Sequence, residues 1–232
     1  MVVDYLKVYE RKIIMTKIEA CIFDGSGVLI NDVNAIFNVS NKILEELRIN
    51  PVTFEDFQSR TKIPFWEYYK SFGLSEEKAK ATDFHFKKFY PLFANGVQLY
   101  PEVKDVLERL KSLDMKLGIV THLPKSVFLT HLQNFGIENL FDSIVTFDDT
   151  DEHKPSPKPL LIALSKMNVN PQNAVFVGDM IEDILTGKRA GVKTIAMIRE
   201  DKPYQLKDEL VKYNPDYFVS NLSEILHNGI II

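Results

Sequence analysis

Hydrophobic and polar residues alternate in two patterns along most of the chain. Short, nearly continuous apolar runs predict buried strands; these are KIEACIF at 17–23, MKLGIV at 115–120, SIVTF at 143–147, NAVFVG at 173–178, KTIAMI at 193–198 and a last run near YFVS at 217–220. Stretches with apolar residues three or four positions apart predict helices; these are 101–113, 125–135, 157–167 and a segment that ends at Gly191. Because strands separated by helices are typical of a parallel sheet covered on both faces, the pattern predicts a doubly wound α/β fold.

The residues between Leu29 and Gln98 depart from this pattern. They contain no strand run and predict helices, including NAIFNVSNKILEEL at 34–47 and SEEKAKATDFHFKKFYPLF at 75–93. Residues 54–93 hold 12 of the chain's 26 aromatic residues, so the insertion can form a small core of its own. We therefore expect three parts, which are an α/β core of 15–30 and 98–232, an inserted helical cap of 31–97, and an N-terminal extension of 1–14.

Composition and charge exclude several classes of function. With 28 basic and 32 acidic residues the formal charge is −4, and no long basic tract is present, so we expect no nucleic-acid partner. The single cysteine, Cys21, lies in an apolar run, which argues against disulfide and thiol chemistry. No stretch approaches the roughly 18 apolar residues of a membrane span, and the charged first fifteen residues do not resemble a signal peptide. These features predict a cytoplasmic protein with no membrane partner.

Polar side chains stand where several predicted strands end. Asp24, Thr121 and Asp179 each follow a strand directly, and Lys154 lies in the loop after another strand. One such aspartate alone is more often a helix cap or a turn residue. The carboxyl ends of parallel strands share one edge of a sheet, however, so we expect these groups to meet there. With Asp183 four residues after Asp179, the carboxylates suit Mg²⁺, whereas Lys154 and Thr121 suit the oxygens of a phosphoryl group.

The order and spacing of these residues resemble a known superfamily. The segment DGSGVL at 24–29, Thr121 in GIVTHLP, Lys154 in HKPSP, and the aspartates of VGDMIED at 177–183 resemble the four motifs of the haloacid dehalogenase (HAD) superfamily. The resemblance extends from about residue 16 to the end of the chain. It is strongest to the branch with a helical cap, which includes phosphoglycolate phosphatases and beta-phosphoglucomutases. It therefore implies a HAD-like Rossmannoid core with an inserted helical cap.

The resemblance also implies a mechanism and a set of site residues. Asp24 would attack phosphorus and form an aspartyl-phosphate, which water then hydrolyses. The metal, Mg²⁺, would be held by Asp24, the Ser26 backbone carbonyl and Asp179, with Asp183 beside it to orient metal-bound water or Lys154. The substrate would be a small phosphorylated metabolite, and the expected substrate-binding residues are Gly25, Ser26, Thr121, Lys154, Arg60 and Lys62. Arg60 and Lys62 also fit the simpler interpretation of solvated surface charges.

Ser26 departs from the phosphatase pattern, which has an aspartate at this position as general acid and base. Losing that group typically slows a reaction by about 10² to 10⁴. His122 is an alternative acid, although a histidine here is more often a packing residue. Three interpretations therefore remain open, namely a hydrolase that is weak on alkyl phosphates, a protein that binds a phosphorylated metabolite without turnover, and an enzyme of phosphonate cleavage. The sequence does not name the substrate or distinguish a monomer from a homodimer.

Overall fold

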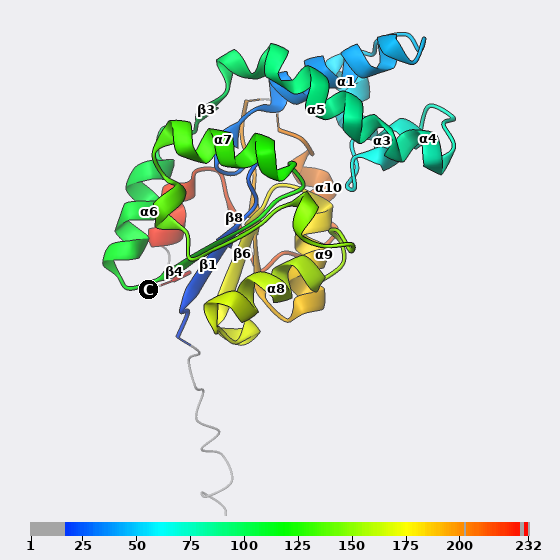
Figure 1. Ribbon diagram of the computed structural model, residues 1–232. Coiled ribbons are helices and arrows are strands. Elements are labelled where there is room, and N and C mark those ends of the chain that lie inside the picture. Colours follow the sequence, from blue (N-terminus) through cyan, green and yellow to red (C-terminus); the bar gives the residue numbers. More distant parts are fainter. Residues whose placement is uncertain (1–16, 202, 228–229, 232) are drawn as a thin grey trace, which may run out of the picture.

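The computed structural model describes residues 17–201, 203–227 and 230–231, so the predicted N-terminal extension of 1–14 lies outside the described residues. Within this part of the chain, six parallel strands form one sheet in the order β5-β4-β1-β6-β7-β8 (Figure 1). The strands are β1 (Ala20–Phe23), β4 (Lys116–Val120), β5 (Ser143–Val145), β6 (Ala174–Gly178), β7 (Lys193–Met197) and β8 (Tyr217–Val219). The predicted doubly wound α/β fold is confirmed.

Helices cover both faces of this sheet because alternate strand residues point to opposite sides. On one face, Cys21 and Phe23 of β1 pack in a cluster with α6 (Val103–Ser112), α7 (Lys125–Phe135) and the 3₁₀ helix η5 (Leu222–Leu226). On the other face, Ala20 and Ile22 pack in a second cluster with α8 (Lys158–Met167). The helices α9 (Ile181–Ala190) and α10 (Lys207–Val211) complete that layer.

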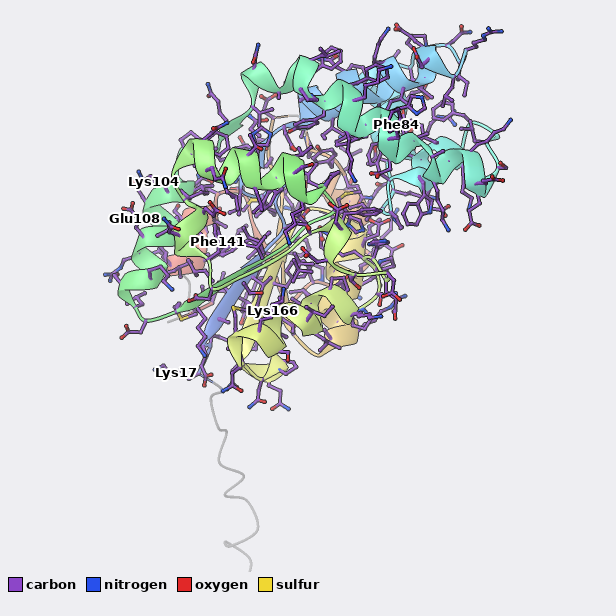
Figure 2. All side chains as sticks on the ribbon, viewed as in Figure 1. Lys17, Phe84, Lys104, Glu108, Phe141 and Lys166 are labelled. Carbon is purple, nitrogen blue, oxygen red and sulfur yellow. The ribbon has the colours of Figure 1, made fainter. Side chains whose placement is uncertain are left out.

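The amphipathic pattern of α6 shows why its sequence forms a surface helix. Val103, Val106 and Leu107 are buried against the sheet, whereas Lys104 and Glu108, four positions apart, are exposed on the outer side of the helix (Figure 2). The end of α7 is also set by its sequence, because Gly136 takes the left-handed conformation, with a φ of 67°, that commonly terminates a helix. No helix in the described residues is long and apolar enough to cross a membrane.

Helices also form the segment that departs from the strand–helix pattern. They are α1 (Val33–Glu46), α2 (Phe54–Arg60), α3 (Trp66–Lys70), α4 (Glu76–Lys80), α5 (Thr82–Phe93) and the 3₁₀ helix η1 (Ala94–Gly96). In Figure 1 they form a layer above one end of the sheet, with α1 packed against α5. The chain enters and leaves this layer through two short strands, β2 (Ile30–Asn31) and β3 (Gln98–Leu99), which pair antiparallel.

Three details differ from the sequence prediction. The helix expected at 75–93 is two helices that meet at Ala81, where the Thr82 hydroxyl donates to the Ala79 carbonyl. The strand expected at 143–147 ends at Val145, because Thr146 and Asp149 form a capping box that begins the 3₁₀ helix η3 (Phe147–Asp149). The strands β2 and β3 were not predicted, since two residues are too few to show a period.

A buried arginine fastens the loop between β1 and β2. Arg199, just after β7, donates from Nη2 to the Val28 carbonyl at 2.7 Å and from Nε to the Gly27 carbonyl at 3.4 Å. Its Nη1 lies 2.6 Å from Glu102 Oε1, and its guanidinium stacks on the Tyr100 ring at 3.6 Å. Although burial opposes ionisation of Glu102, the Arg199 hydrogen bond holds the pKa of that carboxyl below its ordinary value. This arginine therefore couples the loop after β1 to two distant parts of the core.

We expect Arg199→Leu to lower the free energy of unfolding by about 3 kcal/mol, because it leaves Glu102 and two carbonyls without their partner. Chemical denaturation at neutral pH measures this loss, and Arg109→Leu on the exposed side of α6 is the control, with a change of less than about 0.5 kcal/mol. Because the pKa of Glu102 is lowered in the folded state, its stabilising contribution is present above the ordinary value of 4.5 and is lost as the pH falls. A difference between wild type and Arg199→Leu that does not shrink in acid would contradict the assignment.

Candidate active site

The strand order places two aspartates at the point where a doubly wound sheet binds ligands. The chain runs outward from β1 through β4 to β5, then returns to place β6 on the other side of β1. Asp24 directly follows β1 and Asp179 directly follows β6. The Asp24 backbone N–H donates to the Val177 carbonyl at 2.8 Å, which fixes the two strand ends side by side. The strand order changes direction between β1 and β6, which makes this the switch point of the sheet. Such sheets usually bind ligands in a crevice outside the carboxyl ends of the strands at the switch point.

A buried ionic cluster lies at this point. Lys154 Nζ is 2.9 Å from Asp24 Oδ1 and 2.6 Å from Asp183 Oδ1. Carboxylate oxygens of Asp24, Asp179 and Asp183 all lie within 4.8 Å of one another. Each of these four side chains belongs to a residue that is at most 4 % exposed. The structure thus brings together four of the residues that the sequence placed at one edge.

Burial and mutual repulsion disturb the ionisation of this cluster. Burial raises the pKa of Asp24 to about 6, against the opposing charge of Lys154 and with the added repulsion of Asp183. Burial first, and then the charges of Asp24 and Asp183, hold the pKa of Asp179 well above its ordinary value. Although burial favours a neutral amine, the charges of Asp183 and Asp24 hold the pKa of Lys154 above its ordinary value. The Lys154 side chain is therefore a charged ammonium. Its single positive charge does not balance the charges of Asp24, Asp179 and Asp183.

The cluster has the chemistry of a site for a divalent cation. Three carboxylates and one ammonium leave a formal charge of −2, and carboxylate oxygens are the ligands that Mg²⁺ prefers. Asp179 Oδ1 is buried and has no hydrogen-bond partner among the described residues. Asp183 has fewer free oxygens, since Oδ1 pairs with Lys154 and Oδ2 accepts from the Met180 backbone N–H at 3.1 Å. These contacts suit Asp183 to orient Lys154 beside a metal held by Asp24 and Asp179.

Two glycines allow the loop after β1 to approach this cluster. Gly27 has a φ of +75°, and a Cβ there would collide with Asp179 Oδ2. At Gly25 a Cβ would come within 3.0 Å of Thr121 Oγ1. Thr121 is itself buried, and its Oγ1 accepts from the Leu123 backbone N–H at 3.3 Å. The expected phosphate-binding residues Gly25 and Thr121 therefore lie against each other beside Asp24.

The side chain of Ser26 is held by a residue that sequence reasoning missed. Ser26 Oγ donates to Asp32 Oδ2 at 2.7 Å, and the Tyr204 hydroxyl donates to Asp32 Oδ1 at 3.2 Å. Burial raises the pKa of Asp32 to about 7, although both hydrogen bonds favour the carboxylate. No local signal identified Asp32, because its contact with Ser26 depends on the turn between them. Tyr204 comes from a distant part of the chain.

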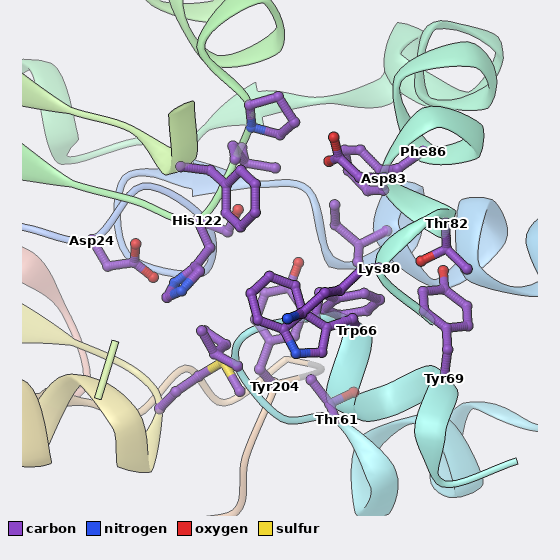
Figure 3. A pocket seen from close by; sticks show the side chains of 18 residues that line it. Asp24, Thr61, Trp66, Tyr69, Lys80, Thr82, Asp83, Phe86, His122 and Tyr204 are labelled. Carbon is purple, nitrogen blue, oxygen red and sulfur yellow. The ribbon is translucent and has the colours of Figure 1, made fainter. Parts of the chain in front are cut away.

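A pocket opens next to Asp24 and Ser26, between the core and the inserted helices α1, α3, α4 and α5. Its lining residues are Asp24, Ser26, Ile36, Thr61, Ile63, Phe65, Trp66, Tyr69, Lys80, Thr82, Asp83, Phe86, His122, Leu123, Pro124, Phe147, Met180 and Tyr204. Figure 3 shows Asp24 and His122 on one side of this space, and Phe86, Tyr69 and Thr82 on the other. The open volume is about 100 Å³, several times the roughly 10–15 Å³ that one water needs. An organic group therefore has room beside Asp24.

Two expected substrate-binding residues do not reach this pocket. Arg60 lies 3.9 Å from Asp56 and 5.0 Å from the ring of Phe72, and Lys62 is exposed. Neither is among the described residues that line the pocket. The exposed position of Lys62 agrees with the simpler interpretation of a solvated charge, whereas Arg60 is half-buried and its Nε has no hydrogen-bond partner among the described residues. The side chains of this loop that line the pocket are Thr61, Ile63 and the aromatic residues after them.

His122 does line the pocket, but its environment argues against a role as the missing acid. Burial, followed by the nearby charge of Lys154, holds the pKa of His122 well below its ordinary value. The ring is therefore neutral at physiological pH, and a neutral imidazole is a poor proton donor. Both ring nitrogens are buried and have no hydrogen-bond partner among the described residues.

The fold and the cluster together define a Rossmann-like enzyme with an acidic centre at the switch point of its sheet. A family model described as "Haloacid dehalogenase-like hydrolase" matches residues 21–197, and the chain belongs to this family. It is 31% identical to the pyrophosphatase PpaX of Bacillus velezensis over 212 residues, which cover 91% of this chain and 96% of that protein. The resemblance that the motifs indicated is confirmed.

Solved structures support the same fold. A haloacid dehalogenase-like family hydrolase from Streptococcus pneumoniae superposes with a TM-score of 0.78 and 25% identity, covering 91% of this chain and 98% of that one. A predicted phosphoglycolate phosphatase from Haemophilus somnus superposes with a TM-score of 0.74 and 24% identity, with the same two coverages. The Rossmannoid sheet and the inserted helices are therefore shared with other proteins of this family.

We expect Asp179→Asn to raise the melting temperature of the metal-free protein while it abolishes stabilisation by Mg²⁺. The substitution removes one of three carboxylates that repel one another. The raised pKa of Asp179 means that its negative charge is unfavourable in the folded state. Mg²⁺ at about 100 times its Kd stabilises a protein by about 2.7 kcal/mol. Thermal unfolding with and without MgCl₂ measures both effects.

Asp114→Asn is the matched control, because Asp114 is exposed and asparagine tolerates its positive φ of 58°. This variant should keep the melting temperature and the Mg²⁺ response of the wild type. An Asp179→Asn protein that Mg²⁺ still stabilises would show that the cluster is not the metal site.

Proposed function

We propose that this chain is a Mg²⁺-dependent hydrolase of small phosphorylated molecules that uses Asp24 as its nucleophile. The observation that supports this most strongly is the position of the Asp24 carboxylate. It lines a pocket, lies 2.9 Å from a buried ammonium and is beside a second, metal-compatible aspartate. A carboxylate, a fixed cation and hydroxyl or backbone donors are the groups that phosphoryl transfer requires. The name of the PpaX relative, a pyrophosphatase, agrees with this class of reaction.

The proposed reaction has two steps. In the first, an Asp24 oxygen bonds to phosphorus while the bond from phosphorus to the leaving oxygen breaks, and that oxygen keeps the electron pair. In the second, water attacks the same phosphorus, the bond to Asp24 breaks, and the protons of the water pass to phosphate and solvent. Lys154 and Thr121 hold the phosphoryl oxygens, and the Asp183 carboxylate fixes Lys154 in position. When bound, Mg²⁺ would supply positive charge to those oxygens, held by Asp24, Asp179 and the Ser26 carbonyl with Asp183 beside it.

The hydrogen bond of Ser26 defines which substrates suit this site. A serine hydroxyl cannot supply a proton as an aspartic acid does, and here its proton points to Asp32. A leaving group that departs as a stable anion, such as a carboxylate or a phosphate, needs no such proton. An alkoxide does need one. The proposed enzyme is therefore efficient on acyl phosphates and similar anhydrides and weak on alkyl esters.

Two other functions are less well supported. Phosphonate cleavage uses an amine that forms an imine with the substrate, and the one lysine among the described residues that line the pocket is Lys80. Lys80 is exposed and ion-paired with Glu76 at 2.6 Å, which does not suit an imine-forming amine. A binding protein without turnover would not require the metal-compatible arrangement of Asp24, Asp179 and Lys154. The cytoplasmic location and the choice between monomer and homodimer stay predictions.

We expect turnover to fall steeply as the leaving group becomes more basic. With MgCl₂ present, acetyl phosphate and p-nitrophenyl phosphate should be hydrolysed about 10² to 10⁴ times faster than glycerol 1-phosphate, which is the range of general-acid effects. Steady-state release of phosphate measures the three rates, and Asp24→Asn, which should hydrolyse none of them, is the control for contaminating phosphatases. If acetyl phosphate is not turned over and no phosphoenzyme forms, the binding protein is the better description.

We also expect exchange of Ser26 and Asp32 to restore activity on alkyl phosphates. Ser26→Asp alone would place a carboxylate against that of Asp32, whereas Ser26→Asp with Asp32→Ser keeps one carboxyl and one hydroxyl in contact. The double variant should raise kcat on glycerol 1-phosphate by up to about 10² to 10⁴, and Ser26→Asp alone should raise it less. Acetyl phosphate should show little change. Equal rates on glycerol 1-phosphate for wild type and double variant would show that the missing acid does not limit this enzyme.

A further inference from the structure

The walls of the pocket indicate more about the substrate than the ionic cluster does. Beyond Asp24 and Ser26, six of the lining residues are aromatic; these are Phe65, Trp66, Tyr69, Phe86, Phe147 and Tyr204. Ile36, Ile63 and Leu123 add aliphatic side chains to the lining. The wall combines helices α3 and α5 with the core loops after β4 and β5, so it exists only when these parts are packed together.

Most polar groups in this wall are already satisfied within the protein. The Thr61 hydroxyl donates to the Phe57 carbonyl at 2.7 Å, and the Thr82 hydroxyl donates to the Ala79 carbonyl at 2.6 Å. The Tyr204 hydroxyl donates to Asp32. These side chains therefore present largely apolar surface to a ligand. Two lining residues are different. The two ring nitrogens of His122 and the hydroxyl of Tyr69 are buried and have no hydrogen-bond partner among the described residues. His122 faces the pocket next to Asp24 (Figure 3).

The charges of the wall do not suit a second anionic group. Among the described residues that line the pocket, Lys80 carries the only ammonium or guanidinium charge, and Glu76 neutralises it at 2.6 Å. Asp83 adds a carboxylate, which Lys87 pairs with at 3.2 Å. A second phosphate or a carboxylate would have to be buried among aromatic rings without an unpaired cation, which is unfavourable. Apolar surface in the same place would be removed from water, which is favourable.

We propose that the substrate carries its phosphoryl group on a flat, largely apolar organic body such as an aromatic ring, with a polar group placed next to the phosphoryl group and facing His122. This inference rests on the proposed function for the position of the phosphoryl group. It differs from a substrate such as pyrophosphate, whose second phosphoryl group would lie against the aromatic wall. Rings of Trp66, Phe86 and Tyr69 provide the faces and edges that pack against a planar ligand.

Binding of phosphonates, which this site cannot hydrolyse, tests the inference without relying on turnover. In calorimetry with MgCl₂, phenylphosphonate should bind at least about tenfold more tightly than methylphosphonate, and phosphonoacetate should bind more weakly than methylphosphonate. If methylphosphonate and phenylphosphonate bind equally, or if phosphonoacetate binds most tightly, the proposed substrate class is wrong although the phosphoryl site stands. If none of the three binds, the proposed function itself fails.

Two residues of the same helix provide a matched pair of variants. Phe86 and Phe84 both belong to α5, but Phe86 lines the pocket, whereas Phe84 is 71% exposed and lies on the cap surface (Figure 2). Phe86→Ala should reduce the preference for phenylphosphonate over methylphosphonate at least about fivefold, and Phe84→Ala should leave it unchanged. Phe86→Leu, which keeps apolar volume for the fold, should reduce it by a smaller factor. An unchanged preference in both Phe86 variants would overturn the assignment of the wall.

Comparing two acyl phosphates separates the effect of the substrate's apolar body from the effect of its leaving group. Benzoyl phosphate and acetyl phosphate both release a carboxylate, so they differ mainly in the apolar body attached to it. We expect kcat/KM for benzoyl phosphate to exceed that for acetyl phosphate by about tenfold in the wild type, and this ratio to fall in Phe86→Leu. A higher kcat/KM for acetyl phosphate or pyrophosphate would contradict the inference.

Discussion

The structure of this protein depends on an imbalance of charge, in which three buried carboxyl groups share one buried ammonium. Lys154 pairs with Asp24 and Asp183, whereas Asp179 retains an oxygen without a partner in the described part of the chain. Such a cluster is unfavourable until further positive charge arrives. A divalent cation would supply that charge, and without it the same carboxylates would repel a phosphoryl dianion. Metal binding and substrate binding are therefore expected to be coupled.

The fold keeps this unfavourable cluster in place through contacts outside it. The parallel sheet aligns the ends of β1 and β6, and helices on both faces hold that sheet rigid. Arg199 fixes the loop after β1 through two of its carbonyls, and the glycines of this loop leave room for Asp179 and Thr121. The inserted helices have a separate task, because they contribute the apolar wall of the pocket rather than groups for phosphoryl chemistry. The complete wall thus combines these helices with the core loops after β4 and β5.

The side chain of Ser26 is oriented by its hydrogen bond to Asp32. Under the proposed function, a serine at this position lacks the carboxyl group that would protonate a leaving oxygen. Its hydroxyl donates to Asp32, at the start of the inserted segment. The segment after Asp24 therefore carries one hydroxyl, of Ser26, and one carboxyl group, of Asp32, with the hydroxyl nearer to Asp24 in sequence.

The sequence alone determined the parallel α/β core and the residues of the ionic cluster, because these depend on local periodicity and on the rule that strand ends share one edge. Its motifs also identified the family, which the comparisons confirmed. Only the tertiary structure showed that Ser26 donates to Asp32, that Arg199 holds the loop after β1, and that Thr61 and Ile63 rather than Arg60 and Lys62 line the pocket. These contacts join residues through turns and packing angles that no local pattern encodes. The order of residues along the chain therefore predicted which charged side chains meet, whereas only the packed structure showed which side chains line the pocket beside them.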